Sequence, residues 1–202
     1  MITTAPLPEP LTHLITDEQQ SLFMEVIDES LRMVNRSHLF NWLQRSFQCL
    51  IPHEVLIIGV RGVNSAIYEY EYITSTRYFG DQQFEQVLND VNGLVSTGFQ
   101  HWAKIKIPVF YGPDVSTSDY LNFSVVQIGE EAAADSELRH FVVHGFEDER
   151  NKVSTLVMFG RLGTSLNAPT AHLLKLLIPE IAGRGNVFIL INCTIHATHT
   201  DD

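Results

Sequence analysis

The stretch that decides the fold is residues 137–162, which read ELRHFVVHGFEDERNKVSTLVMFGRL. It holds two runs rich in β-branched and aromatic residues, 138–146 and 153–161, joined by a charged connector at 147–152. Such runs favour strands, and a short polar link between two strands favours an antiparallel hairpin. We expect the first strand to close at His144-Gly145. The chain is therefore predicted to be built around a sheet.

The composition is that of an ordinary globular protein with a substantial core. Of the 202 residues, 45% are hydrophobic and 18% are charged, which suits one domain. There are 24 acidic and 13 basic residues, giving a net charge of −11, and no run of four basic residues occurs. Because phosphate binding needs clustered Lys and Arg, we expect no direct nucleic-acid binding by this chain.

The cysteines and the termini indicate the compartment. Cys49 and Cys193 form neither a zinc-ligand pattern nor a disulfide framework, so a reducing cytoplasm is expected, with Cys49 a small buried side chain. The first residues lack the basic start and the apolar stretch of a signal peptide. The apolar run 187–191 is too short to span a bilayer. We therefore expect a cytoplasmic protein without membrane contact.

Helix signals dominate the first fifty residues. After a proline-containing arm at 1–15, Thr16 and Gln19 fit a capping box. Apolar residues at helical spacing then predict an amphipathic helix over 17–34, which Asn35 is expected to stop. Ser37 is expected to cap a second helix at 38–50.

Strand and helix signals alternate over the rest of the chain. The pattern predicts strands at 55–60, 67–74, 107–111 and 121–128, a long helix at 81–101, and a last helix from Asn167-Ala-Pro169 to about Ile181. This order predicts an α+β fold, an α/β/α sandwich. Its antiparallel sheet of about five or six strands would be flanked by helices. We expect a single domain over 16–183 and an atypical tail at 184–202 that adds an edge strand.

Short motifs occur in a fixed order over residues 20–182. They are Trp42-Leu43, Pro52-His53-Glu54, Gly98-Phe99, Trp102, Ile107-Pro108, His144-Gly145, Ser154 and Phe159. In this order they resemble the sensory domain of LuxR-type transcriptional regulators, in the EpsA-like branch associated with exopolysaccharide loci. The resemblance implies a sensory fold like that of GAF, PAS and autoinducer-binding domains.

The chain departs from that family at two places. A helix-turn-helix domain usually follows the sensory domain, but residues 182–202 carry no such pattern. Family members that bind acyl-homoserine lactones carry Trp-x-x-x-Tyr and a downstream Asp-Pro, whereas here Asp90 is followed by Val91. An apolar pocket cannot replace the hydrogen bond that this Asp makes to the ligand amide. The sequence therefore argues against an acyl-homoserine lactone as ligand.

An aromatic stripe suggests where a ligand would bind. Tyr68, Tyr70 and Tyr72 share one face of the predicted strand 67–74, and tyrosine offers both apolar area and a hydroxyl. The full set of pocket candidates is Trp42, Tyr68, Tyr70, Tyr72, Trp102, Phe123 and His144. The same stripe is equally what a strand shows when it packs against helices, so both interpretations stand.

Neither a metal site nor a catalytic site is predicted. On a strand, His140 and His144 lie roughly 13 Å apart, too far to share one ion. No GxSxG, P-loop or HExxH pattern occurs, and no cofactor is expected.

Three functions follow in order of preference. The first is a non-catalytic sensory and dimerisation domain that forms a homodimer. A small apolar ligand would shift the arrangement of this dimer and so control exopolysaccharide genes. The second is a ligand-free dimerisation module that pairs with a full-length regulator and inhibits it. The third is an enzyme on a similar sandwich, which would need convergent polar groups in a pocket.

Overall fold

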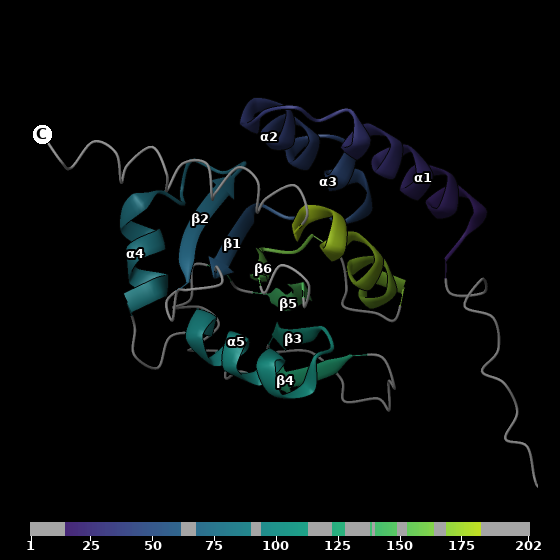
Figure 1. Ribbon diagram of the computed structural model, residues 1–202. Helices are drawn as coiled ribbons and strands as arrows, with labels where there is room; N and C mark the ends of the chain where they lie inside the picture. Colours follow the sequence, from purple (N-terminus) through teal and green to yellow (C-terminus); the bar gives the residue numbers. More distant parts are fainter. Residues whose placement is uncertain are drawn as a thin grey trace, which may run out of the picture.

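The computed structural model describes residues 15–61, 68–89, 94–112, 123–127, 138, 140–148, 153–163 and 169–182. These residues form a six-stranded sheet with helices on both faces (Figure 1). The strand order is β2-β1-β6-β5-β3-β4. The predicted α+β sandwich is confirmed.

The N-terminal helices begin and end at side-chain caps. Helix α1, Asp17–Leu31, opens with the predicted capping box, in which Thr16 and Gln19 bond reciprocally. Helix α2, Arg36–Gln44, begins earlier than predicted, because the side chain of Asn35 accepts from the His38 N–H and caps a helix instead of stopping one.

The predicted helix 38–50 is wrong in its continuity. The backbone at Arg45 leaves the helical region, at φ −121° and ψ −88°, and separates α2 from a short helix α3, Ser46–Leu50. Cys49 on α3 is exposed, so the prediction of a buried side chain is also wrong. The helix turns its Phe47 and Leu50 inward instead.

The centre of the sheet is antiparallel. Strand β1, Val55–Arg61, pairs with β2, Glu69–Thr74, on one side and with β6, Val153–Gly160, on the other. Strand β5, Phe141–Asp148, pairs with β6 as the predicted hairpin. Strand β5 does not close at His144-Gly145 as predicted but continues to Asp148, since both residues keep their ladder partners on β6.

The far edge of the sheet differs from the predicted antiparallel arrangement. Strand β3, Val109–Gly112, pairs antiparallel with β5 but parallel with β4, Ser124–Gln127. A parallel pair needs a crossover between the strands. The alternation of apolar and polar residues encodes which face a side chain takes, not the direction in which its strand runs.

The predicted helix 81–101 is observed as two helices, α4, Asp81–Asn89, and α5, Leu94–Ile105. The last helix spans 169–182. In Figure 1, α1–α3 and this yellow-green helix cover one face of the sheet, while α4 and α5 lie on the other side. The predicted arm at 1–15, except Ile15, and the tail at 184–202 with Cys193 lie outside the described residues.

Alternation along the strands builds two separate cores. Leu56, Ile58, Val157 and Phe159 point toward α1–α3 and helix 169–182. Val55, Ile57, Leu156 and Met158 point toward α5. Because successive side chains of a strand take opposite faces, the sheet separates any site on one face from any site on the other.

Candidate functional site

The face covered by α4 and α5 carries a continuous aromatic surface. The ring of Tyr70 lies parallel to that of Phe99 at a centroid distance of 5.9 Å. The ring of Tyr72 contacts Phe79 at 5.6 Å and Phe84 at 4.7 Å. The predicted tyrosine stripe therefore lies between β2 and the two helices, as a half-buried wall made of planar apolar surfaces.

A glycine on the neighbouring strand makes room for this wall. Gly59 on β1 is the ladder partner of Tyr70. A Cβ at Gly59 would lie 2.5 Å from Cε1 of Tyr70, so the tyrosine ring occupies the space that any other residue would fill. Glycine within a strand commonly marks such a close approach.

The outer hydroxyls of the stripe have partners. The hydroxyl of Tyr68 lies 2.9 Å from Oγ of Ser154, and the Arg61 guanidinium stands 5.0 Å above the Tyr68 ring. The hydroxyl of Tyr72 donates to Oδ1 of Asp81 at 2.6 Å. These hydrogen bonds fix the two ends of the stripe. Tyr70 lies in the middle, where burial raises its pKa to about 12.

Tyr111 on β3 adds a polar group that the sequence analysis missed. Its ring is 1% exposed and stacks on Phe141 at 4.6 Å. Its buried hydroxyl has no hydrogen-bond partner among the described residues, and burial raises its pKa to about 12. A neutral phenol can donate and accept. The alternation of Val109 and Tyr111 in the predicted strand 107–111 was the available signal.

Gly98 of α5 lies against the Tyr111 ring. A Cβ at Gly98 would be 3.6 Å from Cε2 of Tyr111 and 2.7 Å from Cγ2 of Val143. The absence of a side chain lets the helix approach β3 and β5 closely. This glycine thereby keeps the ring of Tyr111 covered by α5.

Trp102 belongs to the same core, and His144 lies beside it at the edge of the sheet. The Trp102 indole donates to Nδ1 of His144 at 3.1 Å, and its ring occupies the place where a side chain at Gly145 would stand. Nζ of Lys106 lies 4.3 Å above the indole. Burial, with a smaller effect of Lys175, lowers the pKa of His144 to about 4. His144 is thus neutral at pH 7, and its Nδ1 accepts the hydrogen bond of the Trp102 side chain.

Trp42 and Phe123 lie on the opposite face of the sheet from the tyrosines. The Trp42 indole donates to the carbonyl oxygen of Val26 at 2.9 Å, and Phe123 packs edge-to-face on Phe110 at 5.0 Å. Both belong to the core under α1–α3 and helix 169–182. The seven predicted pocket residues are therefore not brought together in one cavity.

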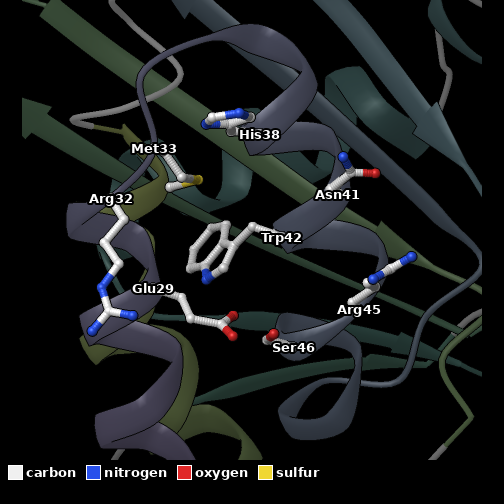
Figure 2. A pocket seen from close by; sticks show the side chains of 8 residues that line it. All are labelled: Glu29, Arg32, Met33, His38, Asn41, Trp42, Arg45 and Ser46. Atoms are coloured by element: carbon white, nitrogen blue, oxygen red, sulfur yellow. The ribbon is translucent and has the colours of Figure 1, made fainter.

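Trp42 instead lines a surface hollow of about 350 Å³ between α1 and α2. Figure 2 shows its ring between Glu29 and Arg32, at the end of α1, and Asn41 and Arg45, at the end of α2. The hollow is open and its rim is polar. It does not continue through the sheet to the tyrosine stripe.

Over the part of the chain that the structure describes, no three His, Cys, Asp or Glu side chains are grouped so that they could hold a metal ion. No helix among these residues is long and apolar enough to cross a membrane. The phenols of Tyr70 and Tyr111 are protonated at neutral pH, because the ordinary tyrosine pKa already lies well above 7 and burial raises both pKa values further, to about 12. A protonated phenol among apolar rings can donate one hydrogen bond to an acceptor.

The sequence matches no protein-family model and no curated protein. Solved structures do share its fold. An N-acylhomoserine lactone-dependent LuxR-family transcription factor, CepR2 from Burkholderia cenocepacia, superposes with a TM-score of 0.56 at 12% identity, over 88% of this chain and 99% of that one. SdiA in complex with octanoyl-rac-glycerol superposes with a TM-score of 0.50 at 14% identity, over 85% of this chain and 68% of that one.

A phycocyanobilin-bound GAF domain from a cyanobacterial phytochrome gives a TM-score of 0.49 at 10% identity, over 92% of this chain and all of that one. At such low identities, the superpositions on CepR2 and SdiA show the fold alone. The chain has the fold of LuxR-family ligand-binding domains.

Proposed function

We propose that this chain is the sensory domain of a LuxR-type regulator of the EpsA-like branch, which binds a small, largely apolar molecule between the sheet and helices α4 and α5. Two lines of support converge. The fold is that of a ligand-dependent LuxR-family transcription factor. The motif order of the sequence, from Trp42-Leu43 to Phe159, adds the EpsA-like resemblance and with it control of exopolysaccharide genes.

The observation that carries the proposal is the buried Tyr111 hydroxyl, for which the described part of the chain offers no hydrogen-bond partner. Leaving a buried hydroxyl unpaired costs about 1–3 kcal/mol, and native proteins rarely keep such a group without a reason. A ligand oxygen would accept a hydrogen bond from this hydroxyl. The Tyr70 and Phe99 rings supply apolar surface on the same side of the sheet. The proposed ligand therefore has an apolar body and one hydrogen-bond acceptor.

This description selects a chemical class. Octanoyl-rac-glycerol, the molecule bound to SdiA, has an acyl chain and an ester carbonyl and is a suitable probe. An acyl-homoserine lactone is not proposed, because the sequence lacks the Asp-Pro motif whose carboxylate would accept a hydrogen bond from the amide N–H of the ligand.

The test is binding of octanoyl-rac-glycerol to purified full-length chain, followed by native mass spectrometry and thermal unfolding. We expect a 1:1 adduct and a raised melting temperature, and we expect Tyr111→Phe to weaken binding about tenfold or more, as for loss of one buried hydrogen bond. Trp42→Phe, on the other face of the sheet, is the matched control and should bind normally. Equal binding by Tyr111→Phe, or no adduct with this probe or with any co-purified molecule, would overturn the proposal.

We also propose that the chain forms a homodimer through α1. Met24, Leu31 and Val34, on and just after this helix, are between 61% and 76% exposed. Exposed apolar side chains in such a group mark association surfaces. If the dimer forms but no small molecule binds, the alternative function of a ligand-free dimerisation module is favoured.

A further inference from the structure

Four segments meet at one end of the sheet. Val55 at the start of β1 pairs with Thr74 at the end of β2 and with Gly160 at the end of β6, and Phe141 at the start of β5 also pairs with Gly160. The residues just outside these four positions therefore lie together. They surround a hollow of about 440 Å³ lined by Glu54, Thr76, Tyr78, His140, Arg161, Leu162 and Gly163.

Arg161 is held in this hollow by a strained backbone. Its φ is 53°, in the left-handed region that favours glycine. Its N–H donates to the carbonyl of Leu138 at 2.8 Å, and the next N–H, of Leu162, donates to the carbonyl of His140 at 3.2 Å. A strained residue fixed by its neighbours is a recurrent feature of binding sites. Here the strain aims a guanidinium into the hollow, with its side chain only 13% exposed.

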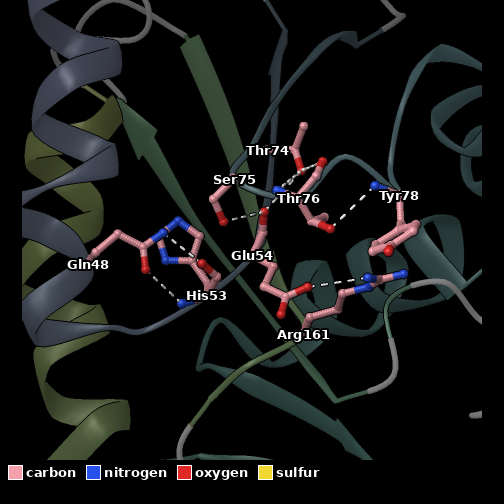
Figure 3. Close-up of polar contacts among 8 residues, drawn as sticks. All are labelled: Gln48, His53, Glu54, Thr74, Ser75, Thr76, Tyr78 and Arg161. Carbon is pink, nitrogen blue, oxygen red and sulfur yellow. Dashed lines mark hydrogen bonds and ion pairs between the residues drawn. The ribbon is translucent and has the colours of Figure 1, made fainter.

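Glu54 forms an ion pair with Arg161, with its Oε2 at 3.2 Å from Nη1 of the arginine (Figure 3). The side chain of Glu54 is 51% exposed, so it is less confined than the side chain of Arg161. The Glu54 backbone is anchored, donating to Gly160 and accepting from Ser75. The half-exposed carboxylate of Glu54 can turn out into water, and the carboxylate of a ligand would then take its place on the guanidinium.

Tyr78 offers a flat surface beside this ion pair. Its ring is 72% exposed, and Figure 3 shows it on the same side as the Arg161 guanidinium. Its backbone N–H donates to Oγ1 of Thr76 at 3.3 Å, and the N–H of Thr76 donates to Oγ1 of Thr74 at 3.1 Å. The ring is therefore carried on a braced turn, and it is placed to cover a planar molecule.

We propose that this hollow binds a small aromatic carboxylate, and that the Glu54 carboxylate occupies the place which the ligand carboxylate takes on Arg161. Arginine recognises a carboxylate by paired, charge-assisted hydrogen bonds, and the ring of Tyr78 packs on the aromatic body. The exchange conserves charge at Arg161: one carboxylate leaves as another arrives. None of the residues of the tyrosine stripe lines this hollow, so the site is distinct from the one proposed above.

An exchange of carboxylates on Arg161 predicts that removing the Glu54 carboxylate strengthens ligand binding. An ion pair with a purely structural role would not have this effect. Removing the internal competitor by Glu54→Gln should increase the affinity for benzoate, about tenfold for one charged hydrogen bond no longer displaced. Arg161→Gln should abolish benzoate binding. Tyr78→Ala, at an exposed position that leaves folding intact, should reduce it several-fold.

The experiment is a titration of the ¹⁵N-labelled full chain with benzoate, followed by amide NMR signals, with benzylamine and inorganic phosphate as parallel probes. We expect benzoate to shift the signals of Thr76, Tyr78 and Gly163, and benzylamine and phosphate to leave them unchanged. Equal response to benzylamine, equal response to phosphate, or no gain of affinity in Glu54→Gln would each overturn the proposal. If Arg161→Gln does not fold, Glu54→Gln and Tyr78→Ala still decide it. Binding of uncharged octanoyl-rac-glycerol tests the other site separately.

Discussion

The indole Nε1 of Trp102 donates a hydrogen bond to Nδ1 of His144 at 3.1 Å, and this bond joins the two faces of the sheet at its edge. Trp102 belongs to the core under α5, whereas position 144 points to the other face by alternation from Phe141. β5 pairs with β3 only as far as Val143, so β3 does not cover the edge here. Because an indole nitrogen only donates, Nδ1 of His144 must accept and its proton lies on Nε2.

Replacing Trp102 should show how its hydrogen bond affects the stability of the protein and the pKa of His144. In Trp102→Phe the buried Nδ1 loses its partner, so we expect the free energy of unfolding to fall by at least about 1–3 kcal/mol. The pKa of His144 should rise from about 4, because the lost bond had favoured the neutral ring. NMR titration of the histidine Cε1 protons measures the pKa. Trp42→Phe, whose indole bonds to Val26, should leave it unchanged, and an unaltered pKa in Trp102→Phe would contradict this role.

Two buried histidines should make the protein sensitive to mild acid. Burial lowers the pKa values of both His53 and His144 to about 4. Between about pH 7.5 and pH 4 the unfolded chain binds protons that the folded chain does not, so stability falls as the pH falls through this window, most steeply below pH 6.5. Each histidine lowers the free energy of unfolding by about 2 kcal/mol between pH 6.5 and 5.

Urea unfolding at pH 7.5, 6.5, 5.5 and 5.0 measures this loss. The upper two values should agree within about 1 kcal/mol, allowing for the part of the titration that begins above pH 6.5, and the lower two should fall progressively. Equal stability at pH 5.0 and 7.5 would show that neither histidine is held neutral in the folded protein.

Local sequence rules predicted the elements with direct chemical signals. The capping box at Thr16 and the hairpin of β5 and β6 are both present, because a cap and a polar connector act within a few residues. The break at Arg45 and the parallel pairing of β3 with β4 were missed. Both depend on how distant segments pack, which no short pattern encodes.

The candidate site was predicted by residue type but not by position in space. Tyr68, Tyr70 and Tyr72 lie on one face because strand alternation requires it. Aromatic content alone could not reveal that Trp42 and Phe123 lie on the other side of the sheet. Which helix covers which face is decided by tertiary packing.

The close approach of Tyr70 to Gly59 should make this glycine intolerant of any side chain. Gly59→Ala places a Cβ 2.5 Å from Cε1 of Tyr70, and the tyrosine is itself stacked on Phe99. We expect a loss of about 1–3 kcal/mol in the free energy of unfolding, typical of overpacking. Gly80→Ala is the matched control, since its Cβ would meet only the flexible end of Gln83 at 3.7 Å. Equal stability of the two variants in urea unfolding would contradict the tight fit.

The exposed apolar residues of α1 should hold two copies of the chain together. Leu31 is 61% exposed, and Leu31→Lys places a charge where an apolar contact is proposed. A charge buried without a partner is costly, so we expect the mass in light scattering after size exclusion to fall from twice 22.9 kDa to 22.9 kDa. Leu176→Lys is the control, because Leu176 is also exposed but lies on helix 169–182. A dimer that survives Leu31→Lys, or that Leu176→Lys breaks equally well, would place the interface elsewhere.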